Sequence, residues 1–102
     1  MIPAYFIISY DVINQEEYQN YGPAVLQLLE KYDASVVVSD TGAVALEGDS
    51  KMVHAIVRFP SEEQALQCYH SVEYEDIKKI RLNSTINCNM ILASNKDLLE
   101  QQ

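Results

Sequence analysis

The sequence predicts a single α+β domain with the element order strand, helix, strand, strand, helix, strand. Four runs rich in apolar, aromatic and β-branched residues, bounded by proline, glycine or polar residues, are typical of strands. Two other segments carry apolar residues at steps of three and four, which indicates amphipathic helices. The chain has 102 residues, of which 48% are hydrophobic and 22% charged, so we expect one globular domain with its own core.

The N-terminal part predicts a strand followed by a helix. Residues 4–13 are rich in aromatic and β-branched side chains and apolar on both faces near their start, as a central strand is. Asn14, with Glu17 three residues later, is typical of a helix N-cap. Pro23 lacks a backbone N–H and disfavours helical geometry at Gly22, so we expect the helix to kink or restart there.

The middle of the chain predicts two further strands. Residues 34–39 form the first of these, and after a turn we expect residues 44–47 to extend the β-structure. Residues 48–51 then reverse the chain direction. The next strand occupies residues 53–59, and Pro60 closes it.

The C-terminal part predicts a second helix and a last strand. Ser61 and Gln64 form an S-x-x-Q capping box, and an alternating strand follows the helix at residues 85–93. The resulting βαββαβ order is the ferredoxin-like plan, a four-stranded antiparallel sheet with two helices on one face. We assign residues 1–93 to this domain and residues 94–102 to a C-terminal tail.

Alternation along the strands separates two faces of the predicted sheet. The almost wholly apolar face, which should meet the helices, comprises Phe6, Ile8, Tyr10, Val12, Val53, Ala55, Val57, Phe59, Ile86, Cys88, Met90 and Leu92. The opposite face comprises Tyr5, Ile7, Ser9, Asp11, His54, Ile56, Arg58, Asn87, Asn89 and Ile91, with Val37 beside them. It contains one candidate ion pair, Asp11 with Arg58. A solvated face rarely gathers so many aliphatic residues, so we predict a homodimer formed through this sheet face.

Charge and targeting signals exclude several classes of protein. The chain carries 15 acidic and 7 basic side chains for a net charge of -8, which argues against a nucleic-acid surface. We find no signal peptide and no apolar stretch long enough to span a membrane. A cytoplasmic protein with Cys68 and Cys88 as reduced thiols is therefore expected. The sequence has no phosphate-binding loop, dinucleotide fingerprint or zinc-ligand spacing, so we predict no cofactor and no metal.

Particular motifs add a family resemblance. They are Tyr18, Tyr21, Glu47-Gly48-Asp49, Phe59-Pro60-Ser61, Ala65, Tyr69, Ser71, Glu73-Tyr74, Ile77, Arg81 and Ser84. Together they resemble DUF1330, a single-domain family within the dimeric α+β barrel superfamily, over roughly residues 5–93. Asp33-Ala34 stands where that family usually has two glycines, and Ser50 and Cys68 stand where it often has tryptophan. The resemblance implies a ferredoxin-like fold and a sheet-to-sheet dimer, and it brings no assigned activity.

A basic cluster is the first candidate for binding a ligand. Tyrosines at helical spacing are the second, and they would otherwise belong to the core. Lys78, Lys79 and Arg81 form a basic cluster, which would hold an anion or simply complement a helix C-terminus. Arg81 also matches the family motif, and a guanidinium suits bidentate carboxylate binding. We predict a small anionic or aromatic organic ligand, in a cleft within one subunit or at the dimer seam. The candidate binding residues are Arg81, Tyr69, Tyr18, Tyr21 and Arg58.

Alternative functions stay open at this point. Some relatives in the superfamily are cofactor-independent monooxygenases or isomerases, and in such an enzyme His54 would be the candidate catalytic acid or base. Glu47 and Asp49 would form a base or cation site, or merely flank an exposed turn at Gly48. A purely structural dimer is the remaining alternative.

Overall fold

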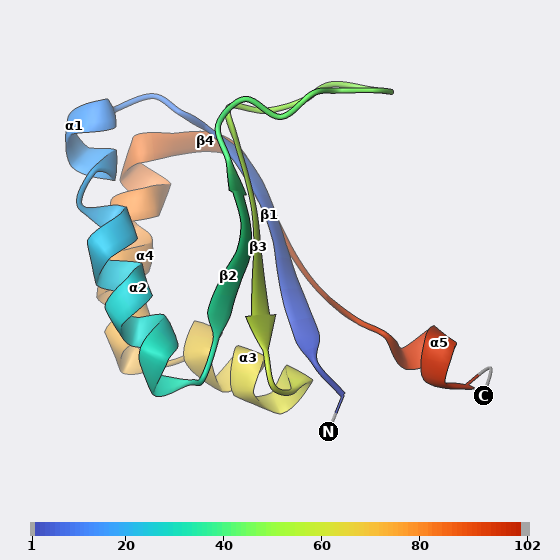
Figure 1. Cartoon of the computed structure of the whole chain (residues 1–102). Helices are drawn as coiled ribbons and strands as arrows, with labels where there is room; N and C mark the ends of the chain where they lie inside the picture. The colour runs from blue at the N-terminus through green and yellow to red at the C-terminus, as the bar shows by residue number, and fades with distance from the viewer. Residues whose placement is uncertain (1, 101–102) are drawn as a thin grey trace.

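The computed structural model describes residues 2–100, which form a four-stranded antiparallel sheet with a helical layer on one face (Figure 1). The strands are β1 (Ala4–Val12), β2 (Ser35–Asp40), β3 (Val53–Phe59) and β4 (Thr85–Ser94), in the spatial order β2-β3-β1-β4. The helices are α1 (Gln15–Tyr18), α2 (Tyr21–Lys31), α3 (Glu62–Tyr69), α4 (Val72–Ser84) and α5 (Lys96–Glu100). The predicted ferredoxin-like α+β fold is confirmed.

Each predicted helix is divided in two, and local capping explains where the breaks fall. The Asn14 side chain accepts a hydrogen bond from the Glu17 N–H at 3.1 Å and so begins α1. The chain restarts as α2 at Tyr21, just before the expected position, so that Pro23 lies in a first turn where its missing N–H costs nothing. Ser71 likewise accepts from the Tyr74 N–H at 3.2 Å and separates α4 from α3.

The helix-facing side of the sheet is closed by a core within the chain. Phe59 is fully buried and meets the Phe6 ring edge-to-face with centroids 5.0 Å apart. The other buried members of this cluster are Tyr21, Leu28, Leu29, Val57, Ala65, Cys68 and Tyr74. This half of the molecule therefore buries its apolar residues without a partner.

The opposite side of the sheet, which we call the open face, carries no helix of the α1–α4 layer (Figure 1). One row of aliphatic residues runs straight across all four strands, because Val38 pairs with Ile56, Ile56 with Ile7, and Ile7 with Ile91. Ile7, Val38 and Ile91 are exposed in the single chain. Val37, displaced by a bulge in β2, is exposed beside them.

A β-bulge corrects one assignment on the open face. Asn87 has a φ of 57°, in the left-handed region that asparagine tolerates, and the register shifts so that Asp11 pairs with Ile86. Ile86 was expected to face the helices. The extra residue in β4 moves it to the open face, where it is exposed.

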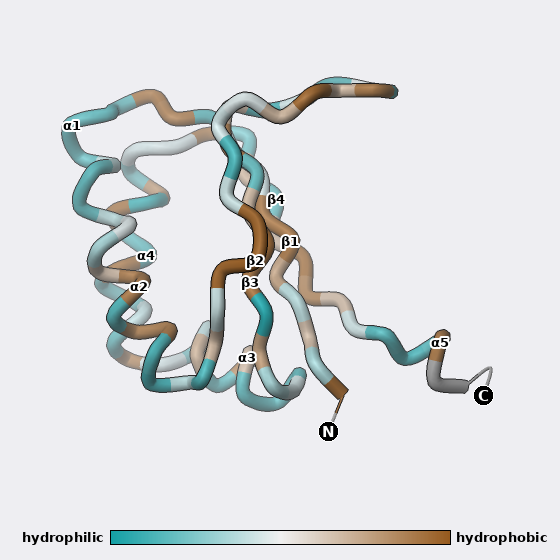
Figure 2. The backbone as a smooth tube through the Cα atoms, in the orientation of Figure 1, coloured by the Kyte–Doolittle hydropathy of each residue, from teal (hydrophilic) through white to brown (hydrophobic). Residues whose placement is uncertain are grey.

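Residues 41–52, which we call the arm, project from the sheet between β2 and β3. The strand predicted at residues 44–47 is wrong, because β2 pairing stops at Asp40 and the chain then leaves the sheet. Val44 and Leu46 are 82% and 91% exposed, and Gly48 reverses the chain with a φ of 77°. The arm and α5 extend on the open-face side (Figure 1), and hydrophobic residues lie near the end of the arm (Figure 2).

Candidate ligand-binding cleft

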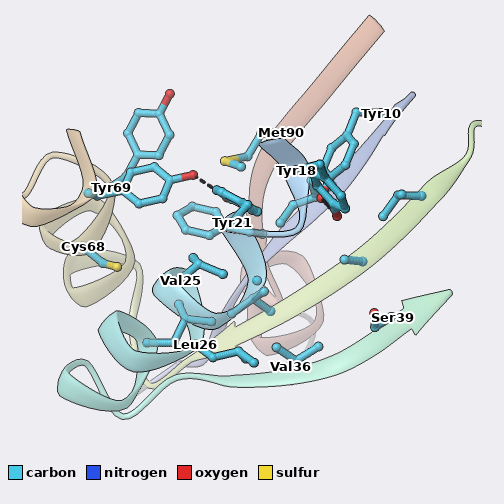
Figure 3. A pocket seen from close by; sticks show the side chains of 18 residues that line it. Tyr10, Tyr18, Tyr21, Val25, Leu26, Val36, Ser39, Cys68, Tyr69 and Met90 are labelled. Atoms are coloured by element: carbon cyan, nitrogen blue, oxygen red, sulfur yellow. Dashed lines mark hydrogen bonds between the residues drawn. The ribbon is translucent and has the colours of Figure 1, made fainter. Parts of the chain in front are cut away.

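A cleft of about 410 Å³ lies between the helical layer and the sheet (Figure 3). Its walls are mostly apolar, and five tyrosines and Ser39 are among the residues that line it. The lining residues include Phe6, Ile8, Tyr10, Tyr18, Tyr21, Val25, Leu26, Leu29, Val36, Ser39, Val53, Val57, Cys68, Tyr69, Tyr74 and Met90. A concave site of this size with few polar groups suits a small organic molecule.

The break between α1 and α2 places two tyrosines in the cleft wall. Tyr18 ends α1 and Tyr21 begins α2, so both rings turn inward and stack with centroids 6.1 Å apart. The Tyr18 hydroxyl pairs with the Tyr10 hydroxyl of β1 at 2.5 Å, and the Tyr21 hydroxyl pairs with the Tyr74 hydroxyl of α4 at 2.8 Å. Two phenol pairs thus link the helices to the sheet and to one another.

Tyr10 and Tyr21 are neutral hydrogen-bonding groups at ordinary pH. Burial raises the pKa of Tyr10, and its hydrogen bond with Tyr18 raises it further. Burial likewise raises the pKa of Tyr21, with a further contribution from Tyr74. Each phenol can therefore donate one hydrogen bond and accept another, which lets the pairs reorganise around a ligand oxygen.

Arg81 lies behind the tyrosines and is only 3% exposed. Its Nη1 donates to the Cys88 Sγ at 2.8 Å, and its Nε has no hydrogen-bond partner. Among the described side chains, those of residues 2–98, no carboxylate forms an ion pair with it. Burial lowers the pKa of Arg81, but the nearby Tyr74 and Tyr21 phenols raise it by more, so the guanidinium stays charged. A buried cation without an anionic partner is costly and calls for electron-rich neighbours.

The predicted basic cluster does not converge on one site. Lys78 lies over the Tyr69 ring, with its Nζ 5.0 Å from the ring centroid, and Lys79 pairs with Asp76 at 3.6 Å on the surface. Only Arg81 of the three is directed inward, because successive positions on a helix point in different directions. The three side chains therefore do not line one common site, and Arg81 alone remains a candidate for the cleft.

His54 and Arg58 lie on the open face, away from the cleft. In the sheet His54 pairs with Ser9 and Arg58 with Tyr5, which puts them on the face opposite Tyr10 and Val57. The expected pair between Asp11 and Arg58 does not form. Asp11 lies at the other end of the strands, where it accepts from the Met52 N–H at 2.9 Å and from the Asn87 side chain at 3.1 Å.

Cys68 and the acidic turn have more limited chemistry. Burial, with a contribution from Glu73, raises the pKa of the Cys68 thiol to about 11, so this cleft residue is protonated at neutral pH. Glu47 and Asp49 are exposed on the arm around the Gly48 turn. In the described part of the chain, no three His, Cys, Asp or Glu side chains gather as metal ligands would, and no helix is long and apolar enough to cross a membrane.

The fold and cleft define a ferredoxin-like α+β protein with a tyrosine-lined cavity under its helices. The model of DUF1330, a domain of unknown function, matches residues 3–95. The chain therefore belongs to this family. No curated protein matches the sequence.

Solved structures share the fold at low sequence identity. A protein of unknown function from Rhodopseudomonas palustris is 16% identical with a TM-score of 0.77, over 90% of this chain and 81% of its own. A dimeric, ferredoxin-like protein of unknown function from Bacteroides fragilis is 12% identical with a TM-score of 0.62, over 90% and 95%. A protein of proposed antibiotic-biosynthesis monooxygenase function from Nitrosomonas europaea is 11% identical with a TM-score of 0.53, over 89% and 88%. These likenesses establish the fold alone.

The sequence identified part of this cleft. Tyr18, Tyr21 and Tyr69 line it and Arg81 adjoins it, as the helical spacing and the family motif indicated. The hydroxyl pairing with Tyr10 and Tyr74 was missed, as was the outer wall formed by Val36 and Leu26. Tyr10 carried a usable signal, because a tyrosine on the helix-facing side of a central strand needs a polar partner.

Proposed function

We propose that the protein is a binding module for a small aromatic molecule that carries an acidic oxygen, held in the tyrosine-lined cleft. The observation that carries this proposal is the buried guanidinium of Arg81, whose Nε has no hydrogen-bond partner and whose charge lies near the Tyr21 and Tyr74 phenols. An apolar cavity gives the ring its binding energy, and the polar groups give orientation and specificity.

The arrangement favours an anionic or electron-rich oxygen over a cation. The positive charge of Arg81 lies next to Tyr21 and Tyr74, so it polarises hydroxyl groups that can donate toward the cavity. Tyr69 and Tyr18 present ring faces and edges suited to an aromatic ligand. Arg58, the fifth residue expected to bind ligand, lies on the open face and would not reach this cleft.

Calorimetric titration with 2-hydroxybenzoate tests the proposal, since this probe combines an aromatic ring, a phenol and a carboxylate. We expect binding to the wild type, loss of binding in Val36→Trp, which fills the cleft from β2, and affinity about tenfold weaker in Arg81→Ala. Val38→Trp, with the same change on the open face of the same strand, is the matched control and keeps the affinity. Equal affinity in the wild type, Val36→Trp and Arg81→Ala would overturn the proposal.

We propose, as the assembly of this module, a homodimer formed through the open face. The aliphatic row of Val38, Ile56, Ile7 and Ile91 supports it, since burying such a row is favourable by about 25 cal/mol per Å². Fold relatives such as the Bacteroides fragilis protein are dimeric. A monomer mass by light scattering at micromolar concentration would contradict this assembly.

An enzyme of the cofactor-independent monooxygenase or isomerase kind is the second candidate, because the Nitrosomonas europaea protein with this fold is a proposed antibiotic-biosynthesis monooxygenase. Its acid or base would need to reach the cleft, where the hydroxyl groups of Tyr18 and Tyr10 are available. His54 would serve only a substrate bound at the open face. If purified protein left phenolic and quinone substrates unchanged, this candidate would lose its support.

A further inference from the structure

The arm presents a hydrophobic knob beside an acidic turn. Leu46, at 91% exposure, is the most exposed large hydrophobic residue among those described, and Glu47 and Asp49 follow it around Gly48. The arm extends on the open-face side of the sheet, where the second copy of the proposed dimer would lie (Figure 1). Exposure of this apolar side chain to water is unfavourable. The side chain suits a pocket on a partner surface, and the acidic turn suits a positive charge beside that pocket.

A surface of this kind lies on the open face, at the end of the sheet opposite the arm. A shallow depression of about 300 Å³ is lined mainly by apolar atoms of Tyr5, Ile7, Val37, Ile56 and Ala93. Arg58 pairs with Tyr5 in the sheet, is exposed, and has no ion-pair partner among the side chains of residues 2–98. The arm leaves the sheet at the start of β3, whereas Arg58 lies near its end. One chain therefore cannot place its own arm on its own depression.

We infer that the arm of each subunit docks on the open face of the other, with Leu46 in the depression and Glu47 or Asp49 beside the partner's Arg58. This rests on the proposed dimer and specifies its geometry. The two-fold axis would run across the strands, so that the arm end of one sheet lies over the Arg58 end of the other. The contact is then made twice, as an isologous interface requires.

In the other simple arrangement the two-fold axis runs along the strands, so the arms of both subunits lie at the same end of the interface. It would bring Glu47, Asp49 and Asp11 of both chains to the same end of the interface. Like charges gathered this way oppose association, whereas the crossed arrangement places the acidic groups beside Arg58. It would also leave Arg58 without the acidic arm.

Engineered disulfides distinguish the two arrangements in the full-length chain. Leu46→Cys combined with Val37→Cys is expected to form an intermolecular disulfide on mild oxidation. Leu46→Cys combined with Ile86→Cys, which reports the other axis, is expected to form none. Wild type and each single-cysteine variant control for Cys68 and Cys88. Light scattering on the same samples separates the two proposals: a monomer overturns both, whereas a dimer that cross-links only through Ile86→Cys overturns the arm docking and leaves the dimer intact.

A charge-swap series gives a second measurement. Arg58→Glu is expected to weaken dimerisation by about five- to tenfold in low salt, and adding Glu47→Lys and Asp49→Lys to the same chain is expected to restore most of the loss. Lys79→Glu, a matched reversal on the outer side of α4, should leave the dimer unchanged. An Arg58→Glu defect that the arm reversals do not reduce, or no defect at all, would overturn the pairing of the arm with Arg58.

Discussion

The two faces of the sheet differ in how far one chain buries their apolar residues. On the helix side, Phe6, Phe59 and their neighbours are buried by the chain's own helices, and the remaining space is a cleft with phenols and a hidden arginine. On the open side, Ile7, Val38 and Ile91 stay exposed in one chain. The difference is what we expect if, as proposed, the first face binds a small molecule and the second binds another protein surface.

The largest expected effect comes from breaking the helix-side core. Phe59→Ala removes a fully buried ring that packs on Phe6, so we expect it to lower the free energy of unfolding by about 3–5 kcal/mol. Val72→Ala, at an exposed position on α4, should change it by less than about 0.5 kcal/mol. Urea denaturation followed by circular dichroism measures both, and equal stability of the two variants would contradict the described core.

The next effect breaks the open face without touching the core. Ile7→Glu puts a carboxylate at the centre of the aliphatic row, so we expect the dimer dissociation constant to rise at least about 100-fold with an unchanged circular dichroism spectrum. Leu66→Glu, at an exposed site on α3, is the matched control. Sedimentation equilibrium measures both, and a wild-type dimer that persisted in Ile7→Glu would place the interface elsewhere.

Alkaline pH separates the buried phenols from the rest of the molecule. Burial raises the pKa of Tyr10 and Tyr21 above their ordinary value of 10.0 in the folded protein only, so the unfolded chain loses these protons first. The two protonated phenols therefore contribute their full share to the free energy of unfolding below pH 10.0. Above that pH the free energy of unfolding falls by about 1.4 kcal/mol per pH unit for each phenol. The Cys68 thiol also lowers the free energy of unfolding as pH rises from 9.0 to about 11, because its pKa is likewise raised in the folded protein.

Tyr21→Phe sharpens this measurement. It removes one titrating phenol and leaves the Tyr74 hydroxyl without its partner, so we expect a loss of about 1 kcal/mol at pH 7 and a shallower decline above pH 10. Urea midpoints at a series of pH values give both quantities. A decline as steep as that of the wild type would mean that Tyr21 does not titrate as described.

The smallest expected effect concerns the bulge that decides which β4 residues reach the open face. Asn87→Gly keeps the left-handed backbone and loses only the exposed hydrogen bond to Asp11, so we expect a change within about 0.5 kcal/mol. Asn87→Val is expected to cost about 1–2 kcal/mol, because a β-branched residue disfavours positive φ. Thermal unfolding compares the two, and a tolerated valine would argue against this bulge.

The fold could be predicted from the sequence because strand alternation, the Asn14 and Ser61 caps and helical spacing are all local signals. What failed depended on pairing between distant residues. The Asn87 bulge moved Ile86 to the other face, and the loss of a β-partner after Asp40 turned an expected strand into the arm.

The candidate site was predicted in part, for a related reason. Tyr18, Tyr21, Tyr69 and Arg81 were identified because helical periodicity and the family motif mark them. The partnership of Arg81 with Cys88 and the separation of Arg58 from the cleft follow from register and helix rotation. Cytoplasmic location stays a prediction of the sequence.

The most direct test of the division between the two faces is an NMR titration of the ¹⁵N-labelled protein with 2-hydroxybenzoate. We expect saturable shift changes at the backbone amides of Tyr21, Val36 and Ser39, which line the cleft, and little change at Ile7, Val38 and Ile91 on the open face. Changes confined to the open face, or no saturable change at the cleft amides, would contradict the claim that the helix side of the sheet binds the small molecule.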